Sequence, residues 1–288
     1  MKHLSGKRVD LHLHSNHSDG VWPPAEVVKK AAEAELAAIA LTDHDTVSGV
    51  GEALAEGDRL GVDVVPGIEI SCQGDGYEVH LLGLFVDHEN AGLLDYARWY
   101  HEERRNRARR ILDRLAEMGM PLDQDALFAE VGNGSLGRPH IAEFLVRQGY
   151  VSSFEEAFEL YLGDGKPAYV PKRKLHPREA IRLVKEAGGL AIAAHPGMDL
   201  TDENLLHLLS LGLDGIEVVH PKHTPEQTAH YWEFARRHNL LVSGGSDCHG
   251  RGDEILLGTL DVPYQIYVDL REAHARRVAG VVATNNTE

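Results

Sequence analysis

The chain has 288 residues, and its 29 Lys and Arg against 45 Asp and Glu give a formal charge of −16. This length suits a complete α/β barrel or two modest domains, and a composition of 43% hydrophobic and 26% charged residues excludes a largely disordered chain. No stretch approaches the ~18 consecutive apolar residues of a membrane-spanning helix, so we expect no membrane partner. The acidic charge also disfavours binding to long duplex nucleic acid.

The first residues and the cysteines indicate a compartment. Residues 1–7 lack the apolar core of a secretory signal, and two cysteines, Cys72 and Cys248, cannot form a disulfide framework. We therefore predict a cytoplasmic protein, and no feature of the sequence requires an obligate protein partner. Histidine is frequent, with 18 residues against 12 prolines, and neutral imidazole is the commonest metal ligand among side chains.

Short β-rich apolar runs alternate with segments of helical period along most of the chain. The predicted strands span residues 8–13, 36–41, 62–70, 79–86, 190–194, 215–219 and 240–243. The predicted helices span residues 24–34, 177–187, 202–211 and 225–238. About seven strands in one chain, with no glycine-rich nucleotide fingerprint after the first strand, favour a closed α/β barrel over an open sheet.

One long segment interrupts this alternation. From Leu93 to Leu162 the sequence is helical and charged without a convincing strand, which predicts a helical insertion at 93–162 that serves as a substrate lid or small subdomain. The barrel is then expected at 1–92 and 163–280. Residues 281–288 are expected to fray at the end of the chain.

The insertion contains a run of arginines. Arg104, Arg107 and Arg114 share roughly one face of the predicted helix. Such a face is consistent with contact to an RNA strand, whose phosphates attract guanidinium groups. A solvated charged helix is the favoured interpretation.

Carboxylates and imidazoles gather at or near the ends of the predicted strands. They are His12, His14, His44, Glu69, His195, Asp247 and His249. Barrel enzymes place their active sites at the ends of the strands, so we expect these distant side chains to converge. His12 and His14 lie two apart on a strand and point the same way, as ligands of one metal ion do, although an isolated pair of this kind is equally typical of a surface.

Spacing alone leaves the roles of Asp19 and His80 open, whereas the position of Glu69 favours a functional role. Glu69 lies in an apolar run, where a carboxylate is costly to bury unless it is paired or bound to a cation. Asp19 is also consistent with a turn or cap, and His80 with a strand entrance. Cys248 is interpreted as a small buried residue rather than a thiolate ligand. The whole pattern favours a polynuclear metal site over scattered structural polar residues.

Mixed imidazole and carboxylate ligands suit Mn²⁺, Zn²⁺ or Fe²⁺ better than Mg²⁺ or Ca²⁺. We therefore predict divalent transition-metal ions as cofactors, with Mn²⁺ first. Adjacent ions of this kind lower the pKa of a shared water and bind the attacking and leaving oxygens of a displacement at phosphorus.

These motifs, in chain order, resemble the polymerase and histidinol phosphatase (PHP) superfamily of metal-dependent phosphoesterases. The matching stretches are 10–15, 18–20, 41–45, 67–69, His80, 194–196 and 245–249. The resemblance implies a distorted (β/α)₇ barrel that holds two to three ions. The ligands it implies are His12, His14, Glu69 and Asp247 for one ion, Glu69, His80 and His195 for a second, and Asp19, His44 and His249 for a third. Glu69 would bridge two of them.

The insertion resembles that of bacterial nucleoside 3′,5′-bisphosphate phosphatases, whose relatives include exoribonucleases acting from the 5′ end. The matching stretches are 137–142, 162–170 and 216–218 with His223. The resemblance implies substrate contacts from Arg138, His140, Lys166, Tyr169 and His223, and catalytic roles for Glu69, His195, Arg138 and His223. From spacing alone, Arg138 is equally a helix-start residue and Lys166 a loop residue.

One stretch departs from the family. Residues 219–222 read Val-His-Pro-Lys, where small polar residues are expected. His220 and Lys222 are therefore either additional cationic contacts or solvated loop residues.

The predicted reaction is removal of the 3′-phosphate from nucleoside 3′,5′-bisphosphates by a metal-bridging hydroxide. The expected partner is thus a small phosphorylated nucleotide or a short oligonucleotide. The alternative is a 5′ to 3′ exoribonuclease on short RNA. An amidohydrolase-type deaminase is less favoured, because those sites typically carry a carboxylated lysine, whereas this chain offers Glu69. A non-catalytic metal-binding protein is also less favoured.

Overall fold

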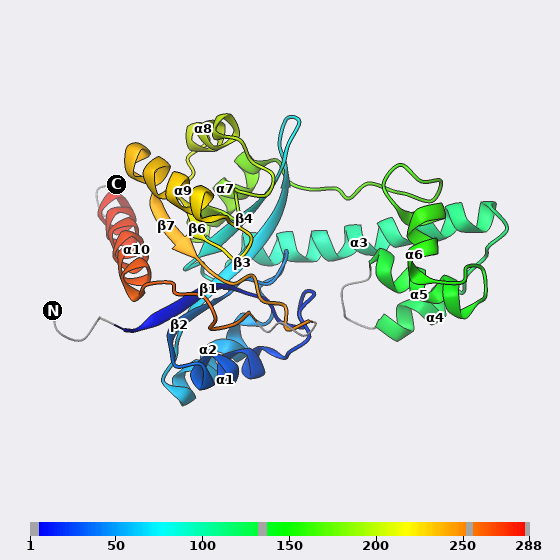
Figure 1. Ribbon diagram of the computed structural model, residues 1–288, viewed down its shortest axis with the longest axis horizontal. Helices are drawn as coiled ribbons and strands as arrows, with labels where there is room; N and C mark the ends of the chain where they lie inside the picture. Colours follow the sequence, from blue (N-terminus) through cyan, green and yellow to red (C-terminus); the bar gives the residue numbers. More distant parts are fainter. Residues whose placement is uncertain (1–5, 132–136, 252–255, 286–288) are drawn as a thin grey trace. The chain divides into compact units, whose positions relative to one another are not determined.

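The computed structural model describes residues 6–131, 137–251 and 256–285, which divide into two compact units (Figure 1). Unit 1 comprises Met1–Tyr96 and Lys174–Glu288, and unit 2 comprises Ala97–Arg173. The sequence predicted an insertion at 93–162, and unit 2 continues beyond that range because its last segment is tied to its first helix. The buried Arg107, in the first helix of unit 2, donates from Nε to the carbonyl of Val170 in its last segment at 2.6 Å.

Unit 1 is built on a seven-stranded sheet whose strands follow one another in chain order. The strands are β1 (Arg8–Leu13), β2 (Leu36–Leu41), β3 (Asp63–Gln73), β4 (Glu78–Leu84), β5 (Leu190–Ala193), β6 (Gly215–Val219) and β7 (Leu241–Gly244). Only β4 runs antiparallel to its neighbours β3 and β5. The segment after β7 returns to β1, where Asp247 donates its amide to the carbonyl of His12 at 3.0 Å. The predicted α/β barrel fold is confirmed.

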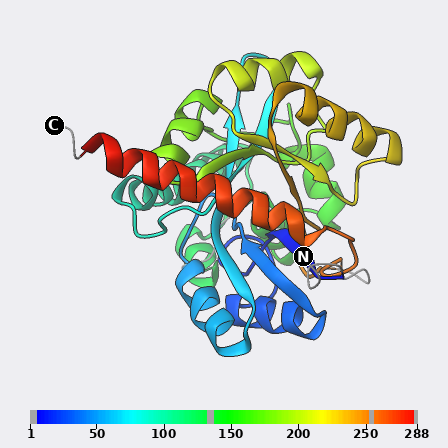
Figure 2. The same cartoon turned by 90° about the vertical axis from the view of Figure 1, so that its left-hand side faces the viewer.

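Helices cover the sheet of unit 1 (Figure 2). They are α1 (Pro24–Glu33), α2 (Val50–Leu60), α7 (Pro177–Glu186), α8 (Asp202–Ser210), α9 (Pro225–His238) and α10 (Tyr264–Asn285). A proline at the first position begins α1, α7 and α9, and Thr201 and Thr224 cap α8 and α9 through side-chain oxygens. The frayed tail predicted from 281 is helical as far as Asn285, and 286–288 lie outside the described residues.

Alternation along β1 explains how one strand serves both the core and a polar site. Val9 and Leu11 point into a hydrophobic cluster that Ile266 and Leu270 of α10 complete. Side chains of opposite parity point to the other face, which is where His12 lies. Full burial of a leucine contributes about 1.5–3 kcal/mol, so the apolar face holds the strand in register while the polar face is presented to the site.

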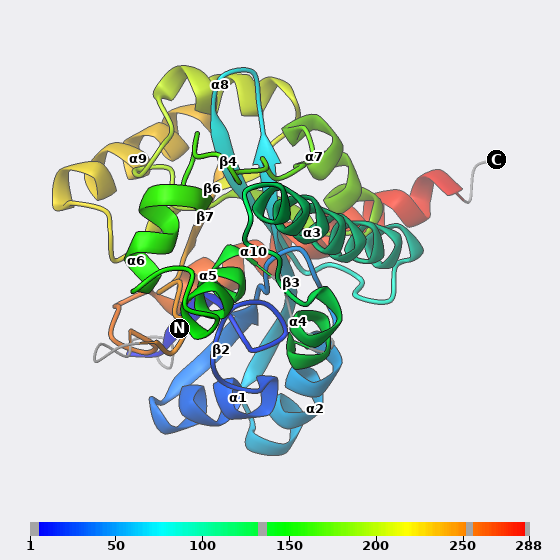
Figure 3. The same ribbon diagram turned by 90° about the vertical axis from the view of Figure 1, so that its right-hand side faces the viewer.

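Unit 2 is helical (Figure 3). It contains most of α3 (Ala91–Glu117), with α4 (Gln124–Val131), α5 (Arg138–Arg147), α6 (Phe154–Ala157) and the π-helical segment η1 (Phe158–Leu162). Its own small core joins Ile111, Leu112 and Leu115 of α3 to Ile141 and Leu145 of α5. No helix in the described ranges of either unit combines the length and apolar character needed to cross a membrane.

Candidate metal centre

The end of β1 places two fully buried imidazoles beside two carboxylates. His12 Nε2 lies 3.3 Å from Glu69 Oε2 and 3.5 Å from Asp247 Oδ1. His14 Nε2 lies 3.3 Å from Glu69 Oε2 and 3.2 Å from Asp247 Oδ1. All four ligand atoms fall within 4.8 Å of one another. The two histidines therefore face the same pair of carboxylates, Glu69 and Asp247.

Glu69 is the centre of the cluster, and its side chain is 0% exposed in the middle of β3. Its Oε2 also lies 3.0 Å from His44 Nδ1. Its other oxygen, Oε1, lies 2.9 Å from His80 Nδ1 and 3.2 Å from His195 Nε2. Each carboxylate oxygen thus faces a different set of imidazoles, which is the arrangement that a ligand bridging two cations requires.

The remaining predicted ligands complete two more groups. Asp19 Oδ1 lies 3.1 Å from His249 Nε2, and both group with His14 and His44. The third group is His44, Glu69 and His80. The structure therefore brings all nine predicted ligands together. Its groups differ from the implied ones in that His14 joins Asp19, His44 and His249, and His44 joins Glu69 and His80. His195 belongs to none of the three groups, but its Nε2 lies 3.2 Å from Glu69 Oε1.

The residues present fit divalent cations. Among the described residues, the buried atom His12 Nε2 has no hydrogen-bond partner, although it faces Glu69 Oε2 and Asp247 Oδ1. Burial of an ionised carboxylate without a compensating charge costs several kcal/mol, and a cation at these atoms removes that cost. Cys248 is buried in a hydrophobic cluster with Leu13, so it packs as an apolar residue, as expected.

The pKa values in the cluster reflect competition between burial and neighbouring charges. Burial acts to raise the pKa of Glu69, but the imidazoles of His44, His12 and His80 outweigh it and hold that pKa well below its usual value. Burial acts to lower the pKa of His14, and hydrogen bonds to Asp247 and Glu69 raise it to about 9. At neutral pH the metal-free cluster therefore combines an ionised Glu69 with a protonated His14, whose proton a metal ion replaces.

Glu217 is a site residue that the sequence analysis did not assign. It is fully buried in β6, its Oε1 lies 3.1 Å from His12 Nδ1, and its Oε2 accepts the backbone N–H of His195 at 2.8 Å. A carboxylate at Nδ1 fixes the proton there and leaves Nε2 as a lone-pair donor toward the cluster. The available sequence signal was a charged residue inside the apolar run 215–219, the same signal that identified Glu69.

Backbone geometry and a second layer of carboxylates hold the loops of the site. Asp43 accepts hydrogen bonds from the Ser15 amide at 2.7 Å and from the Ser18 hydroxyl at 2.6 Å, which fixes the turn that carries Asp19. His195 and Asp247 have positive φ angles of 28° and 53°. That region is unfavourable for residues with a Cβ, so these two side chains are aimed by a strained backbone.

His220 resolves one of the alternatives left open by the sequence. It is 4% exposed, so it is not a solvated loop residue, whereas Lys222 is exposed. The Lys222 amide donates to His220 Nδ1 at 3.3 Å, which places the proton of the neutral ring on Nε2. That atom is buried and lies 3.6 Å from Asp247 Oδ2, opposite the oxygen that faces His12 and His14.

Both ring nitrogens of His223 contact backbone groups of unit 1. Its Nδ1 donates to the carbonyl of Val218 at 2.9 Å, and its Nε2 accepts the amide of Gly197 at 3.1 Å. Both ring nitrogens are thus engaged in the pattern of a neutral imidazole, and burial lowers its pKa further. His223 therefore links the loop of Gly197 to the end of β6.

Within unit 2, the predicted substrate residues have well-defined surroundings. Arg138 begins α5, donates to Asp164 Oδ1 at 2.6 Å and lies over the ring of Tyr169. His140 Nδ1 accepts the amide of Gly137 at 3.2 Å and so caps the same helix, while Lys166 is exposed. The structure brings Arg138 and Tyr169 together and gives His140 a capping contact.

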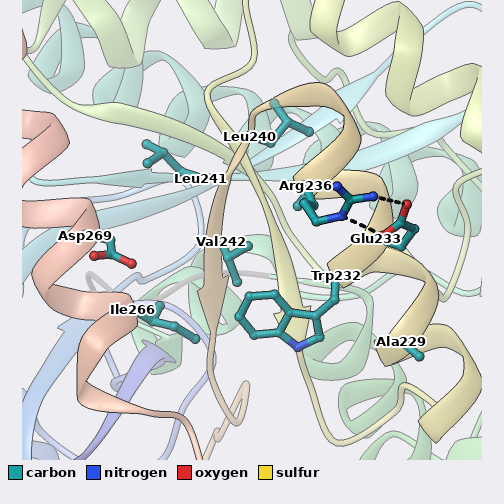
Figure 4. A pocket seen from close by; sticks show the side chains of 10 residues that line it. Ala229, Trp232, Glu233, Arg236, Leu240, Leu241, Val242, Ile266 and Asp269 are labelled. Carbon is teal, nitrogen blue, oxygen red and sulfur yellow. Dashed lines mark hydrogen bonds and ion pairs between the residues drawn. The ribbon is translucent and has the colours of Figure 1, made fainter.

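Two cavities in unit 1 differ in chemistry. One of about 670 Å³ is lined by α9, β7 and α10, with Trp232, Val242 and Ile266 beside the Arg236–Glu233 ion pair (Figure 4). It contains none of the clustered ligands. A smaller one of about 40 Å³ is lined by His80 and His195 and therefore adjoins the metal centre.

Comparison with known proteins agrees with this geometry. Residues 10–117 match the PHP domain family. A 3′,5′-nucleoside bisphosphate phosphatase from Chromobacterium violaceum is 34% identical over 276 residues, covering 93% of this chain and 97% of the relative. The 5′-3′ exoribonuclease Rnm from Escherichia coli is 33% identical over 247 residues, covering 83% of this chain and 84% of the relative.

The fold agrees as well. A crystal structure from Bifidobacterium adolescentis, of a protein assigned as a metal-dependent phosphoesterase, matches with a TM-score of 0.78 and 32% identity over 92% of this chain and 96% of that chain. Phosphoester hydrolysis is thus the reaction class, rather than the deamination weighed from the sequence. The chain belongs to the PHP-domain family of metal-dependent phosphoesterases.

Proposed function

We propose that this protein removes the 3′-phosphate from nucleoside 3′,5′-bisphosphates. The observation that carries the proposal is the buried cluster around Glu69, whose two oxygens face separate sets of imidazoles. The relative that matches over nearly the full length of both chains is named for this activity. The proposed cofactors are two to three divalent ions, Mn²⁺ first, because imidazole and carboxylate ligands suit that class of metal.

In this proposal, three sets of ligands hold the ions. His12, His14, Glu69 and Asp247 hold one, Glu69 with His80, His44 and His195 a second, and Asp19, His44 and His249 a third. When bound, such ions supply a water of lowered pKa and fixed positive charge for the phosphoryl oxygens.

The protein's own groups keep the ligands in the required protonation state. Glu217 holds the proton of His12 on Nδ1, so that Nε2 is the ligand atom. His220 directs its Nε2 proton toward Asp247 Oδ2 and so favours Oδ1 as the ligand oxygen. Both residues are buried, which keeps water from competing for these contacts.

The second phosphate of the substrate is the proposed source of selectivity. Arg138, Lys166 and Tyr169 are the side chains proposed to bind it, with His140 supporting the start of α5. A hydrogen bond to a charged group contributes roughly 1.5–3 kcal/mol, which corresponds to ten-fold or more in kcat/KM when it is made in the transition state. We therefore expect a bisphosphate to be hydrolysed at least ~10-fold more efficiently than a 3′-monophosphate.

The test compares kcat/KM for adenosine 3′,5′-bisphosphate and adenosine 3′-monophosphate on the natural protein and on Arg138→Ala. The substitution is expected to narrow the difference between the two substrates while metal content stays constant. Equal values for both substrates on the natural protein would remove the second-phosphate contact from the proposal.

A second candidate function is 5′ to 3′ exoribonuclease activity on short RNA. It is favoured by the identity to the Rnm exoribonuclease, which is close to that of the phosphatase. In both reactions cleavage of the P–O3′ bond releases a nucleoside 5′-phosphate. The diester differs in that its phosphorus also carries the 5′ oxygen of the remaining RNA. A 5′-phosphorylated RNA in the same assay separates the two, and a clear preference for it would make the exonuclease the main activity.

A further inference from the structure

Unit 2 has a second cationic site that the proposed reaction does not use. A cavity of about 400 Å³ is formed by α3 and the segment that leads back to unit 1. Its lining residues are Arg110, Asp113 and Arg114 from α3 and Val170, Pro171, Lys172 and Arg173 from the returning segment. Four cationic side chains thus face one acidic residue around this cavity.

The distribution of charge makes this site distinctive within the chain. Residues 97–173 contain 12 Lys and Arg and 12 Asp and Glu, so unit 2 is formally neutral and unit 1 carries the whole charge of −16. Phosphate chains are repelled by an acidic surface and attracted by local clusters of Arg and Lys. Of the two units, unit 2 is therefore the one on which a polyanion binds without net repulsion.

The walls of the cavity are held by hydrogen bonds that leave two arginines at the surface. Arg114 donates to the carbonyl of Tyr169, and Arg107 donates to that of Val170. These bonds fix the returning segment against α3. Arg110 and Arg173 have instead 49% and 65% of their side chains exposed.

Arg110 and Arg173 form long ion pairs with the same carboxylate, that of Glu103. Glu103 lies 3.7 Å from Arg110 NH2 and 3.6 Å from Arg173 NH1, which are longer than hydrogen bonds. The two arginines are exposed, and Glu103 is 17% exposed. Ion pairs at a protein surface contribute about 0–1 kcal/mol, so a phosphate displaces these two at little cost.

An aromatic ring lies beside one of the arginines that line this cavity. The Arg173 guanidinium lies 5.8 Å from the centre of the Trp99 ring, and Trp99 is half-buried. Sites for single-stranded nucleic acid combine a basic groove, which follows the phosphates, with aromatic side chains on which bases stack. The Arg173 guanidinium and the Trp99 ring beside it distinguish this region from a charged helix face that only contacts solvent.

We propose that this cavity binds the phosphodiester backbone of single-stranded RNA, with Arg110 and Arg173 as phosphate contacts and Trp99 as a stacking surface. The proposal rests on the proposed function only in taking nucleotides as the substrate class. It adds a contact for the part of an oligonucleotide that a nucleoside bisphosphate lacks. Arg107 and Arg114 of the arginine run then have a structural role, because they hold the wall of the cavity.

The binding test uses the full chain in EDTA, so that no hydrolysis occurs. Fluorescence anisotropy measures the Kd of a 5′-phosphorylated, labelled RNA hexamer as a function of salt. The double variant Arg110→Gln, Arg173→Gln is expected to weaken binding at least ~10-fold and to reduce the slope of log Kd against log salt by about 1.4, since each contact to a single strand contributes about 0.7. Trp99→Leu is expected to weaken binding with the slope unchanged.

The matched control also removes two exposed arginines, through Arg59→Gln and Arg236→Gln in unit 1, which leaves the charge change equal. It is expected to retain the natural Kd. An equal loss in both double variants would show a nonspecific charge effect and overturn the proposal. Absence of RNA binding by the natural protein would overturn it as well.

Kinetics separates this proposal from the proposed function. In the metal-loaded enzyme, the Arg110 and Arg173 double variant is expected to lose about 10-fold in kcat/KM for the RNA and to keep its kcat/KM for adenosine 3′,5′-bisphosphate. Equal losses for both substrates would overturn the cavity as an RNA site. If the natural protein binds RNA through these residues but hydrolyses neither substrate, the cavity is supported and the proposed function fails.

Discussion

Two glutamates lie inside apolar strands of this protein, and their different neighbours give them different tasks. Glu69 faces five imidazoles with its two oxygens, whereas Glu217 contacts the far side of one of them, His12. The first is thus placed to bind ions, and the second to hold a ligand in its working tautomer.

Glu217→Gln is expected to lower metal affinity or kcat by 10- to 100-fold while the protein stays folded, because an amide no longer attracts the proton to His12 Nδ1. Metal content by mass spectrometry after dialysis, together with kcat, measures the effect. Unchanged metal retention and unchanged kcat would contradict the role of Glu217. Glu233→Gln, at an exposed ion pair, is the matched control.

Glu69→Gln is expected to abolish turnover more completely than Asp19→Asn. Glu69 presents oxygens to two ligand groups, whereas Asp19 belongs to one and is more exposed. Circular dichroism should show both variants folded. Near-normal kcat in Glu69→Gln with full metal content would exclude the bridging role.

At the scale of elements, the strand boundaries were largely predictable and several helices were not. Apolar runs closed by polar residues located the strands that carry the site, since that pattern is local. Helix α2 was missed because Gly49 precedes it without a side-chain cap, and α10 because its apolar residues do not recur with a clear helical period.

The contacts of the site were less predictable than its ligands. His223 contacts Gly197, which comes from another loop, and no spacing within one segment reveals that contact. The end of unit 2 depends likewise on hydrogen bonds from α3 to a segment more than fifty positions later. Ligand types could be read from the sequence because burial of charge is costly wherever it occurs.

Arg107→Ala is expected to destabilise unit 2 by about 2–3 kcal/mol, because it removes a hydrogen bond from a charged donor and leaves the Val170 carbonyl without it. Limited proteolysis should show faster cleavage within 97–173, while metal binding by unit 1 is retained. The exposed Arg109 on the same helix provides the control through Arg109→Ala, which should leave the cleavage rate unchanged. Equal cleavage rates in the two variants would contradict this role.

For the whole molecule, the metal-free protein is expected to be most stable near pH 6.5. Hydrogen bonds to Asp247 and Glu69 outweigh burial and raise the pKa of His14 from 6.5 to about 9. Protonated His14 therefore adds to the free energy of unfolding. This stabilisation is complete below pH 6.5 and is lost as the pH rises toward 9. Burial lowers the pKa of His44 to about 3, so the folded state favours the neutral form of this side chain. The stability associated with neutral His44 is present above pH 6.5 and is lost as the pH falls.

Thermal unfolding in EDTA across this range measures the effect. A decrease of at least about 1 kcal/mol from pH 6.5 to 9 is expected, since one pKa unit corresponds to about 1.4 kcal/mol. With added Mn²⁺, the free energy of unfolding should instead increase with pH, because the metal competes with protons for the same imidazoles. A stability of the metal-free protein that rises steadily through this range would contradict the assignment.

The positive φ angles at His195 and Asp247 imply a conflict between thermal stability and activity. Glycine adopts such angles without the cost of about 1–2 kcal/mol that a Cβ imposes. Selection of this chain for heat resistance alone would therefore favour glycine at both positions, and each replacement would delete a side chain of the metal centre. Thermostable variants obtained without an activity screen should accumulate there as folded, inactive proteins.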